Sequence, residues 1–224
     1  MRRDYLATGE SVPEQGMDAV QRQQMKERHQ RSLSHFGYAP ESLFWGSRGV
    51  QKVRFKALAG IGIAAGDSLL DVGCGFADLY SWLASHDLPV TYTGIDLSPE
   101  ILDRAKELNP ELQLLQGEIF DFDWPPQTFD WVFLSGTLNW DLKDEGEHVR
   151  RVIRRMFRLC RSGVAFNLLD ARDFDARHLV ELSAYEPEEM LAFCSQMTPD
   201  CCLRSDYLGG DFTIYMRPVA GNAV

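Results

Sequence analysis

LLDVGCGFADLYSWL, Leu69 to Leu83, joins a short apolar run to a segment with helical periodicity through a turn that holds two glycines. The run SLLDV predicts a buried strand, and Phe76, Leu79 and Leu83 recur at the spacing of one helix face. A strand that stops at Gly-x-Gly lets the backbone approach a ligand, and the following helix offers unpaired N–H groups at its amino terminus. The stretch therefore predicts a ligand-binding turn between a strand and a helix.

The same alternation continues after this turn. Further strands are expected at TYTGIDL, LQLLQ, FDWVFLS and GVAFNLLD. Helices are expected after Ser98, a natural N-cap followed by Pro99, then over Val149–Cys160, and over Met190–Met197. Strands that alternate with helices are typical of βα units and a parallel sheet.

The carboxyl-terminal segment follows a different pattern. CCLRSDYL and DFTIYMRP are both rich in strand-forming residues, and only Gly209 and Gly210 separate them. Two strands with so short a connection form a hairpin, because a parallel pair needs a long crossover. The chain is therefore expected to end in an antiparallel pair.

Composition and charge narrow the function classes. The 224 residues are 45% hydrophobic and 25% charged, as in an ordinary globular domain. A net charge of −10 argues against a nucleic-acid partner, whose phosphates need clustered Lys and Arg. No stretch approaches the roughly 20 apolar residues of a membrane span, and the amino terminus lacks the apolar run of a secretory signal. The 5 cysteines lack metal-site spacing, so we expect no metal, no disulfide framework and a cytoplasmic location.

The chain is expected to divide into an extension and a core. Residues 1–60 are predicted to form a helical amino-terminal extension, with helices over Met17–Phe36 and Ser47–Ala59, and residues 61–224 to form the α/β core. The extension is expected to cover the ligand site.

Two carboxylates narrow the choice of ligand. Asp96, which follows Gly75 by 21 positions at the end of the second predicted strand, is placed to accept hydrogen bonds from two ribose hydroxyls. Asp71 lies at the end of the first strand, where a carboxylate would repel a pyrophosphate and attract an ammonium group. A ligand with an adenosyl ribose and an α-amino group but no phosphates satisfies both, and S-adenosylmethionine is such a ligand.

LLDVGCGFADL and YTGIDLSPEIL resemble the first and second motifs of the class I S-adenosylmethionine-dependent methyltransferases, and LLQGEIFDFDWPPQTFDWVFLSGTLNW resembles their third and fourth strands. The resemblance implies a three-layer Rossmann-like fold: a mostly parallel seven-stranded sheet with an antiparallel hairpin strand at the carboxyl terminus. It also implies S-adenosyl-L-methionine as the cofactor. Its motifs cover residues 66–140 firmly, whereas residues 1–60 lie outside the common core.

The resemblance also implies roles for individual residues. The methionine portion of the cofactor would lie against Asp71, Gly73, Cys74, Gly75 and Ser135, the ribose against Asp96, and the adenine against Leu97, Glu118 and Ile119. Cys74 is expected to be a packing residue, because methyl transfer from a sulfonium needs no covalent enzyme intermediate. Leu138, Asn139 and Trp140 would face the acceptor.

Other residues are open to two interpretations. Trp45, Gln51 and Arg54 either close over the cofactor, with Arg54 binding its carboxylate, or are ordinary packing and surface residues. The basic cluster on the predicted helix before the fifth strand is interpreted as a solvated helix flank; it comprises Arg150, Arg151, Arg154, Arg155, Arg158 and Arg161. Candidates for a general base, if one is used, are Asp141, His148, Asp170 and His178.

The expected reaction is in-line transfer of a methyl group to a small-molecule acceptor, by a monomer or homodimer. The fourth strand ends in LSGTLN and lacks the Asn/Asp-Pro-Pro-aromatic motif with which some family members position a planar nitrogen. Two alternatives stay open: a non-catalytic S-adenosylmethionine-binding subunit or sensor, and an NAD-dependent oxidoreductase. Ala77 stands where nucleotide-binding loops usually have a last glycine, and we expect it to be a small helix-forming residue where helix meets strand.

Overall fold

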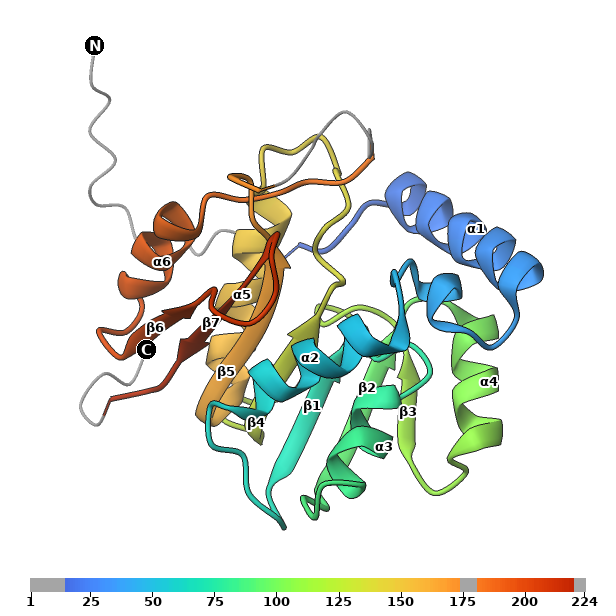
Figure 1. Cartoon of the computed structure of the whole chain (residues 1–224), viewed down its shortest axis with the longest axis horizontal. Helices are drawn as coiled ribbons and strands as arrows, with labels where there is room; N and C mark the ends of the chain where they lie inside the picture. Colours follow the sequence, from blue (N-terminus) through green and yellow to red (C-terminus); the bar gives the residue numbers. More distant parts are fainter. Residues whose placement is uncertain (1–14, 174–180, 220–224) are drawn as a thin grey trace.

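The computed structural model in Figure 1 describes residues 15–173 and 181–219. Its centre is a 7-stranded sheet with the order β3-β2-β1-β4-β5-β7-β6. The first five strands are parallel, and β7 runs antiparallel to both β5 and β6. The strands are β1 (Ser68–Val72), β2 (Thr91–Asp96), β3 (Gln113–Gln116), β4 (Phe129–Ser135), β5 (Cys160–Leu169), β6 (Cys201–Arg204) and β7 (Asp211–Met216).

Helices cover both faces of the sheet, which gives the three layers predicted from the sequence (Figure 1). One face packs against α2 (Arg48–Ala59), α3 (Asp78–Ala84) and α4 (Pro99–Leu108). The other face packs against α5 (Glu147–Leu159) and α6 (Pro187–Ser195). No helix separates β3 from β4, and an irregular loop connects them.

The alternation of side chains along the strands builds two separate cores. In β1, Leu70 and Val72 face α5 and α6, whereas Leu69 faces α2 and α3. In β4, Val132 and Phe133 divide between the two faces in the same way. Asp71 therefore shares its face with α2 and α3, and the residue is 3% exposed.

The extension begins with α1 (Ala19–Phe36), followed by the short 3-10 helix η1 (Pro40–Leu43) and by α2. A capping box starts α1, because Asp18 accepts a hydrogen bond from the Gln21 N–H at 2.8 Å and the Gln21 side chain accepts one from the Asp18 N–H at 3.0 Å. Only Ser32 of α1 is buried. Figure 1 shows α1 beyond the carboxyl ends of the parallel strands, near α4.

Three details differ from the sequence-based predictions. Cys160 begins β5 instead of ending α5, because its backbone is extended (φ −87°, ψ 148°). Ser98 precedes α4 but makes no side-chain cap, since its hydroxyl donates to Glu100 at 3.3 Å. The basic cluster is not uniformly solvated: Arg155 is 6% exposed and donates to the Phe122 carbonyl at 2.9 Å, so it anchors the β3–β4 loop.

Candidate cofactor and acceptor site

A cavity of about 570 Å³ lies at the carboxyl ends of β1, β2 and β4. It brings together all the residues proposed from the sequence for the cofactor: Trp45, Gln51, Arg54, Asp71, Gly73, Cys74, Gly75, Asp96, Leu97, Glu118, Ile119 and Ser135. Leu138, Asn139, Trp140, Asp141 and His148 also line it, whereas Asp170 does not. His178 lies outside the described residues.

Gly73 and Gly75 shape the turn after β1. Both have positive φ, 72° and 55°, a region that side chains disfavour. A Cβ atom at Gly73 would stand 2.1 Å from Thr137 Oγ1, and one at Gly75 would stand 2.6 Å from Leu43 Cδ1. Glycine is therefore required for close packing against the β4 loop on one side and the extension on the other.

Ala77 differs from the prediction made for it. It lies just before α3 in the left-handed conformation, with φ 61° and ψ 31°, and is completely buried. Helix propensity therefore does not explain the residue, because it is not helical. Its side chain belongs to the same buried cluster as Leu79 and Leu83 and does not line the cavity, so it does not narrow the site directly.

Asp71 is held by one strong hydrogen bond, from the Tyr92 hydroxyl at 2.6 Å. Burial raises the pKa of Asp71 to about 7, and the carboxylates of Asp96 and Asp78 contribute in the same direction. A cationic group in the cavity would reverse this effect, because an opposite charge favours the ionised carboxyl. Binding of an ammonium group by Asp71 stays a prediction, and the buried carboxyl beside the cavity is compatible with it.

Asp96 is oriented by the backbone. One carboxyl oxygen accepts from the Gly75 N–H at 3.0 Å and the other from the Ser98 N–H at 2.9 Å. Each oxygen keeps acceptor capacity for a ligand hydroxyl. Cys74 is 7% exposed, and burial raises the pKa of its thiol well above the ordinary value, which fits a packing residue.

Glu118 lies at the opposite wall, next to Ile119. Its carboxylate is 8% exposed, accepts from the Met17 N–H at 2.9 Å and forms an ion pair with Arg22. Glu118 Oε2 has no hydrogen-bond partner among the described residues. An acceptor that is buried and unpaired carries a desolvation cost that a donor from a ligand would remove.

Arg54 is already paired. Its Nε and Nη2 both donate to Asp211, which is 2% exposed, and its guanidinium lies 4.7 Å from the centre of the Trp45 ring. Arg54 is thus not a free surface charge, and two of its nitrogens are occupied. Trp45 is 8% exposed and packs beside Phe55 and Gly136.

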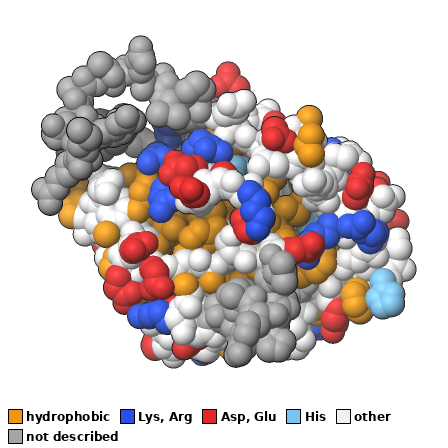
Figure 2. Space-filling model, turned by 90° about the horizontal axis from the view of Figure 1, so that it is seen from above, with side chains coloured by type: hydrophobic (Ala, Val, Ile, Leu, Met, Phe, Trp, Pro, Cys, Tyr) orange, Lys and Arg blue, Asp and Glu red, His pale blue; other side chains and the backbone are white. Residues whose placement is uncertain are grey.

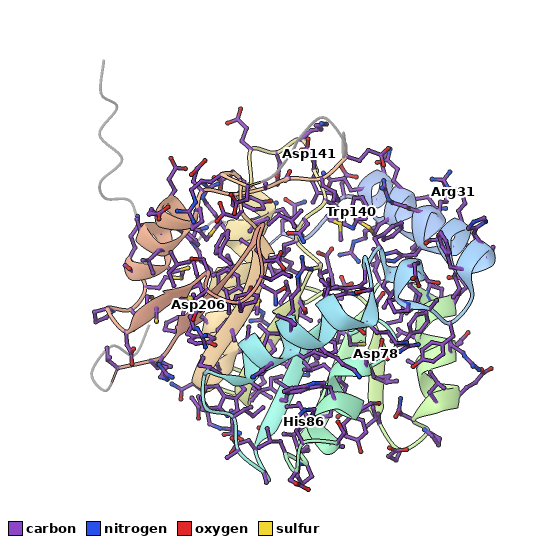
Figure 3. All side chains as sticks on the ribbon, in the orientation of Figure 1. Arg31, Asp78, His86, Trp140, Asp141 and Asp206 are labelled. Carbon is purple, nitrogen blue, oxygen red and sulfur yellow. The ribbon has the colours of Figure 1, made fainter. Side chains whose placement is uncertain are left out.

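Aromatic side chains surround the mouth of the cavity. Trp140 and Phe44 meet edge to face with ring centres 5.1 Å apart, and the Arg28 guanidinium lies 3.6 Å from the centre of the Trp140 ring. Figure 3 places Trp140 and Asp141 between α1 and the segment that leads to α6. Figure 2, which looks onto this side, shows hydrophobic side chains across the middle of the face with charged groups around them.

The candidate general bases differ in environment. Burial lowers the pKa of His148 to about 4, and its Nδ1 has no hydrogen-bond partner among the described residues, so the ring is neutral at pH 7. The Lys143 ammonium lowers the pKa of Asp141. Asp170 is tied to Arg172, whose donated hydrogen bonds lower the pKa of Asp170. Of these three, His148 has a ring nitrogen without a partner among the described residues, but this Nδ1 is buried.

Sequence reasoning missed several residues of the site. Thr137 and Leu43 enclose the glycine turn, and Met17 and Arg22 hold Glu118. Asn167 orients the end of β4, where its side-chain oxygen accepts from the Gly136 N–H at 3.1 Å. None of these belongs to a local motif. The sequence indicated a role for them only in that some follow a predicted strand and others lie in or near a polar helix.

Comparison with known proteins agrees with this geometry. Residues 69–163 match the model of a methyltransferase domain family. The chain is 38% identical over 106 residues to a phosphatidylethanolamine N-methyltransferase from Cereibacter sphaeroides, covering 45% of this chain and 48% of that protein. It is 30% identical over 134 residues to a fatty-acid O-methyltransferase from Mycolicibacterium smegmatis, covering 57% of this chain and 46% of that protein. The chain thus spans about half the length of these curated relatives.

A solved structure shares the fold. The S-adenosylmethionine-dependent methyltransferase from Archaeoglobus fulgidus has a TM-score of 0.62 at 13% identity, over 80% of this chain and 97% of that chain. The sheet order, the antiparallel β7 and the match over residues 69–163 agree with one another. Residues 69–163 therefore match a methyltransferase domain on a fold shared with a solved S-adenosylmethionine-dependent methyltransferase, which supports the class I family predicted from the sequence.

Proposed function

We propose that the protein transfers a methyl group from S-adenosylmethionine to a small-molecule acceptor by in-line displacement. The observation that carries the proposal is the set of complementary groups that line one cavity: Asp71 for an ammonium group, Asp96 for ribose hydroxyls, and Glu118 for an adenine amino group. The cofactor, when bound, supplies an activated methyl group. The protein holds the acceptor in line with it and excludes water, which supplies much of the rate.

The residues of the extension are proposed to cover the cofactor. Leu43 packs against Gly75, Gln51 donates to Asp78 at 3.0 Å, and Trp45 lines the cavity beside Arg54. These contacts support a role for residues 1–60 in closing the site. Arg54 is proposed to act mainly through its pair with Asp211, with Nη1 left to face the ligand.

The acceptor is proposed to have an apolar body. The cavity wall beyond the cofactor residues is rich in large apolar side chains: Met17, Met25, Phe44, Trp140, Leu142, Leu182 and Tyr185. Such a wall favours a hydrocarbon or aromatic acceptor over a small polar acid. The relatives named above act on nitrogen and on oxygen, so they do not choose the acceptor atom.

The setting of the reaction is also a proposal. All 5 cysteines are free, which supports a reducing compartment such as the cytosol. No described helix has the length and apolarity needed to cross a membrane. We propose a small-molecule acceptor without a nucleic-acid partner, consistent with the net charge of −10.

A methyl-transfer screen tests the proposal. The purified protein is incubated with S-adenosylmethionine and a panel of amines, phenols and carboxylic acids that share apolar bodies, and formation of S-adenosylhomocysteine is measured. Asp96→Asn should lower turnover, whereas Asp206→Ala, on the surface away from the cavity (Figure 3), should not. Binding of the cofactor without turnover across the panel would favour the non-catalytic sensor.

A further inference from the structure

The first turn of α1 makes a contact that the methyltransferase core alone does not require. Arg22 forms an ion pair with Glu118 and a bidentate pair with Asp121, at 2.7 and 2.8 Å. Arg22 Nε also donates to the Met17 carbonyl at 3.1 Å. Every direction of this guanidinium is therefore fixed, and one of its partners is the carboxylate proposed to bind adenine.

The chain before α1 is fitted to the same carboxylate. The Met17 N–H donates to Glu118 Oε1 at 2.9 Å. A Cβ atom at Gly16 would stand 2.2 Å from Glu118 Oε1, so a larger residue there would displace the Glu118 carboxylate. Asp121 also accepts from the Glu118 N–H at 3.0 Å, which fixes the backbone of Glu118. These contacts fix the Glu118 carboxylate at the cavity wall, where its Oε2 is buried and has no hydrogen-bond partner among the described residues.

We propose that Arg22 is a positioning residue of the cofactor site, which holds the Glu118 carboxylate in place at the cavity wall for the adenine amino group. The inference rests on the proposed binding of S-adenosylmethionine. Under this proposal, docking of α1 and binding of the cofactor favour each other, because each stabilises the ionised carboxylate of Glu118.

The charge balance of Glu118 supports this role. Burial raises the pKa of Glu118, and the Arg22 guanidinium and the Met17 N–H oppose that shift. Without Arg22, burial and the nearby Asp121 carboxylate would still raise the pKa of Glu118, and less would oppose them, so this pKa would rise further. A protonated Glu118 is a weaker acceptor, because hydrogen bonds to ionised groups are about twice as strong.

Calorimetric titration with S-adenosylmethionine tests the proposal. Arg22→Ala should weaken affinity roughly tenfold at neutral pH, and the deficit should grow as the pH is lowered. Arg22→Lys should restore most of the affinity at neutral pH, because it restores the charge. Arg31→Ala is the matched control, since Arg31 is exposed on the same helix (Figure 3).

A second background separates positioning from folding. In a Glu118→Gln protein, which has no carboxylate to ionise, Arg22→Ala should cause little further loss of affinity and no new pH dependence. Equal losses in both backgrounds, or a pH-independent loss, would overturn the proposal. If the folded wild-type protein does not bind S-adenosylmethionine, the proposed function fails instead, so the two failures are distinguishable.

Discussion

Gly73→Ala should destabilise the fold and the cofactor site together. The substitution places a side chain at φ 72°, which costs about 1–2 kcal/mol in the left-handed region. The new Cβ would also stand 2.1 Å from Thr137 Oγ1 and 2.6 Å from Thr137 Cγ2. Overpacking of this kind costs about 1–3 kcal/mol, so the expected loss of unfolding free energy is about 2–5 kcal/mol.

Urea denaturation measures this loss, and a matched glycine isolates its two causes. Gly66 has φ 93° but nothing within 4 Å of an added Cβ, so Gly66→Ala should show the backbone cost alone. Thr137→Ala removes the two atoms that clash most closely and should partly rescue Gly73→Ala in the double variant. Equal destabilisation of Gly66→Ala and Gly73→Ala, with no rescue by Thr137→Ala, would refute the reasoning.

Three further substitutions test other parts of the site. Asp71→Asn should stabilise the protein at about pH 8 and make its stability less dependent on pH. The pKa of Asp71 is about 7 in the folded protein, above its unfolded value, so the wild type loses stability as the pH rises. Thermal unfolding at several pH values measures this difference. Asp71→Asn should also weaken S-adenosylmethionine binding. Arg54→Ala should lower the free energy of unfolding by about 3–5 kcal/mol, because it leaves the buried Asp211 unpaired. The double variant Arg54→Ala with Asp211→Asn should recover much of this stability. A smaller loss in the single variant would contradict the role of the pair. Ala77→Gly should change the free energy of unfolding by less than about 1 kcal/mol. Glycine relieves the backbone strain at φ 61°, which offsets the lost burial of the methyl group and the added entropy of the unfolded chain. The affinity for the cofactor should stay unchanged.

The sequence predicted the sheet because the apolar runs and the glycine turn are local features. SLLDV became β1 over Ser68–Val72, and TYTGIDL became β2 over Thr91–Asp96. The carboxyl ends of parallel strands meet at one edge, so Asp71 and Asp96 could be placed in the same site from their positions after strands alone. The antiparallel β7 was also predicted correctly.

The remaining features depend on contacts between distant segments. Arg22 and Glu118 belong to a polar helix and a loop that no motif links, and Arg54 and Asp211 are separated by 157 positions. The buried position of Arg155 depends on the irregular loop that it anchors. The conformation of Ala77 could not be predicted, because few residues other than glycine adopt positive φ.

Calorimetric titration of the folded protein with S-adenosylmethionine, S-adenosylhomocysteine and NAD tests the central claim most directly. Binding of both sulfur compounds is expected, with much weaker binding of NAD, because the carboxylate of Asp71 at the end of β1 favours an ammonium group and repels a pyrophosphate. Asp96→Asn should weaken binding of both sulfur compounds. Tighter binding of NAD, or no binding of either sulfur compound by folded protein, would contradict the account.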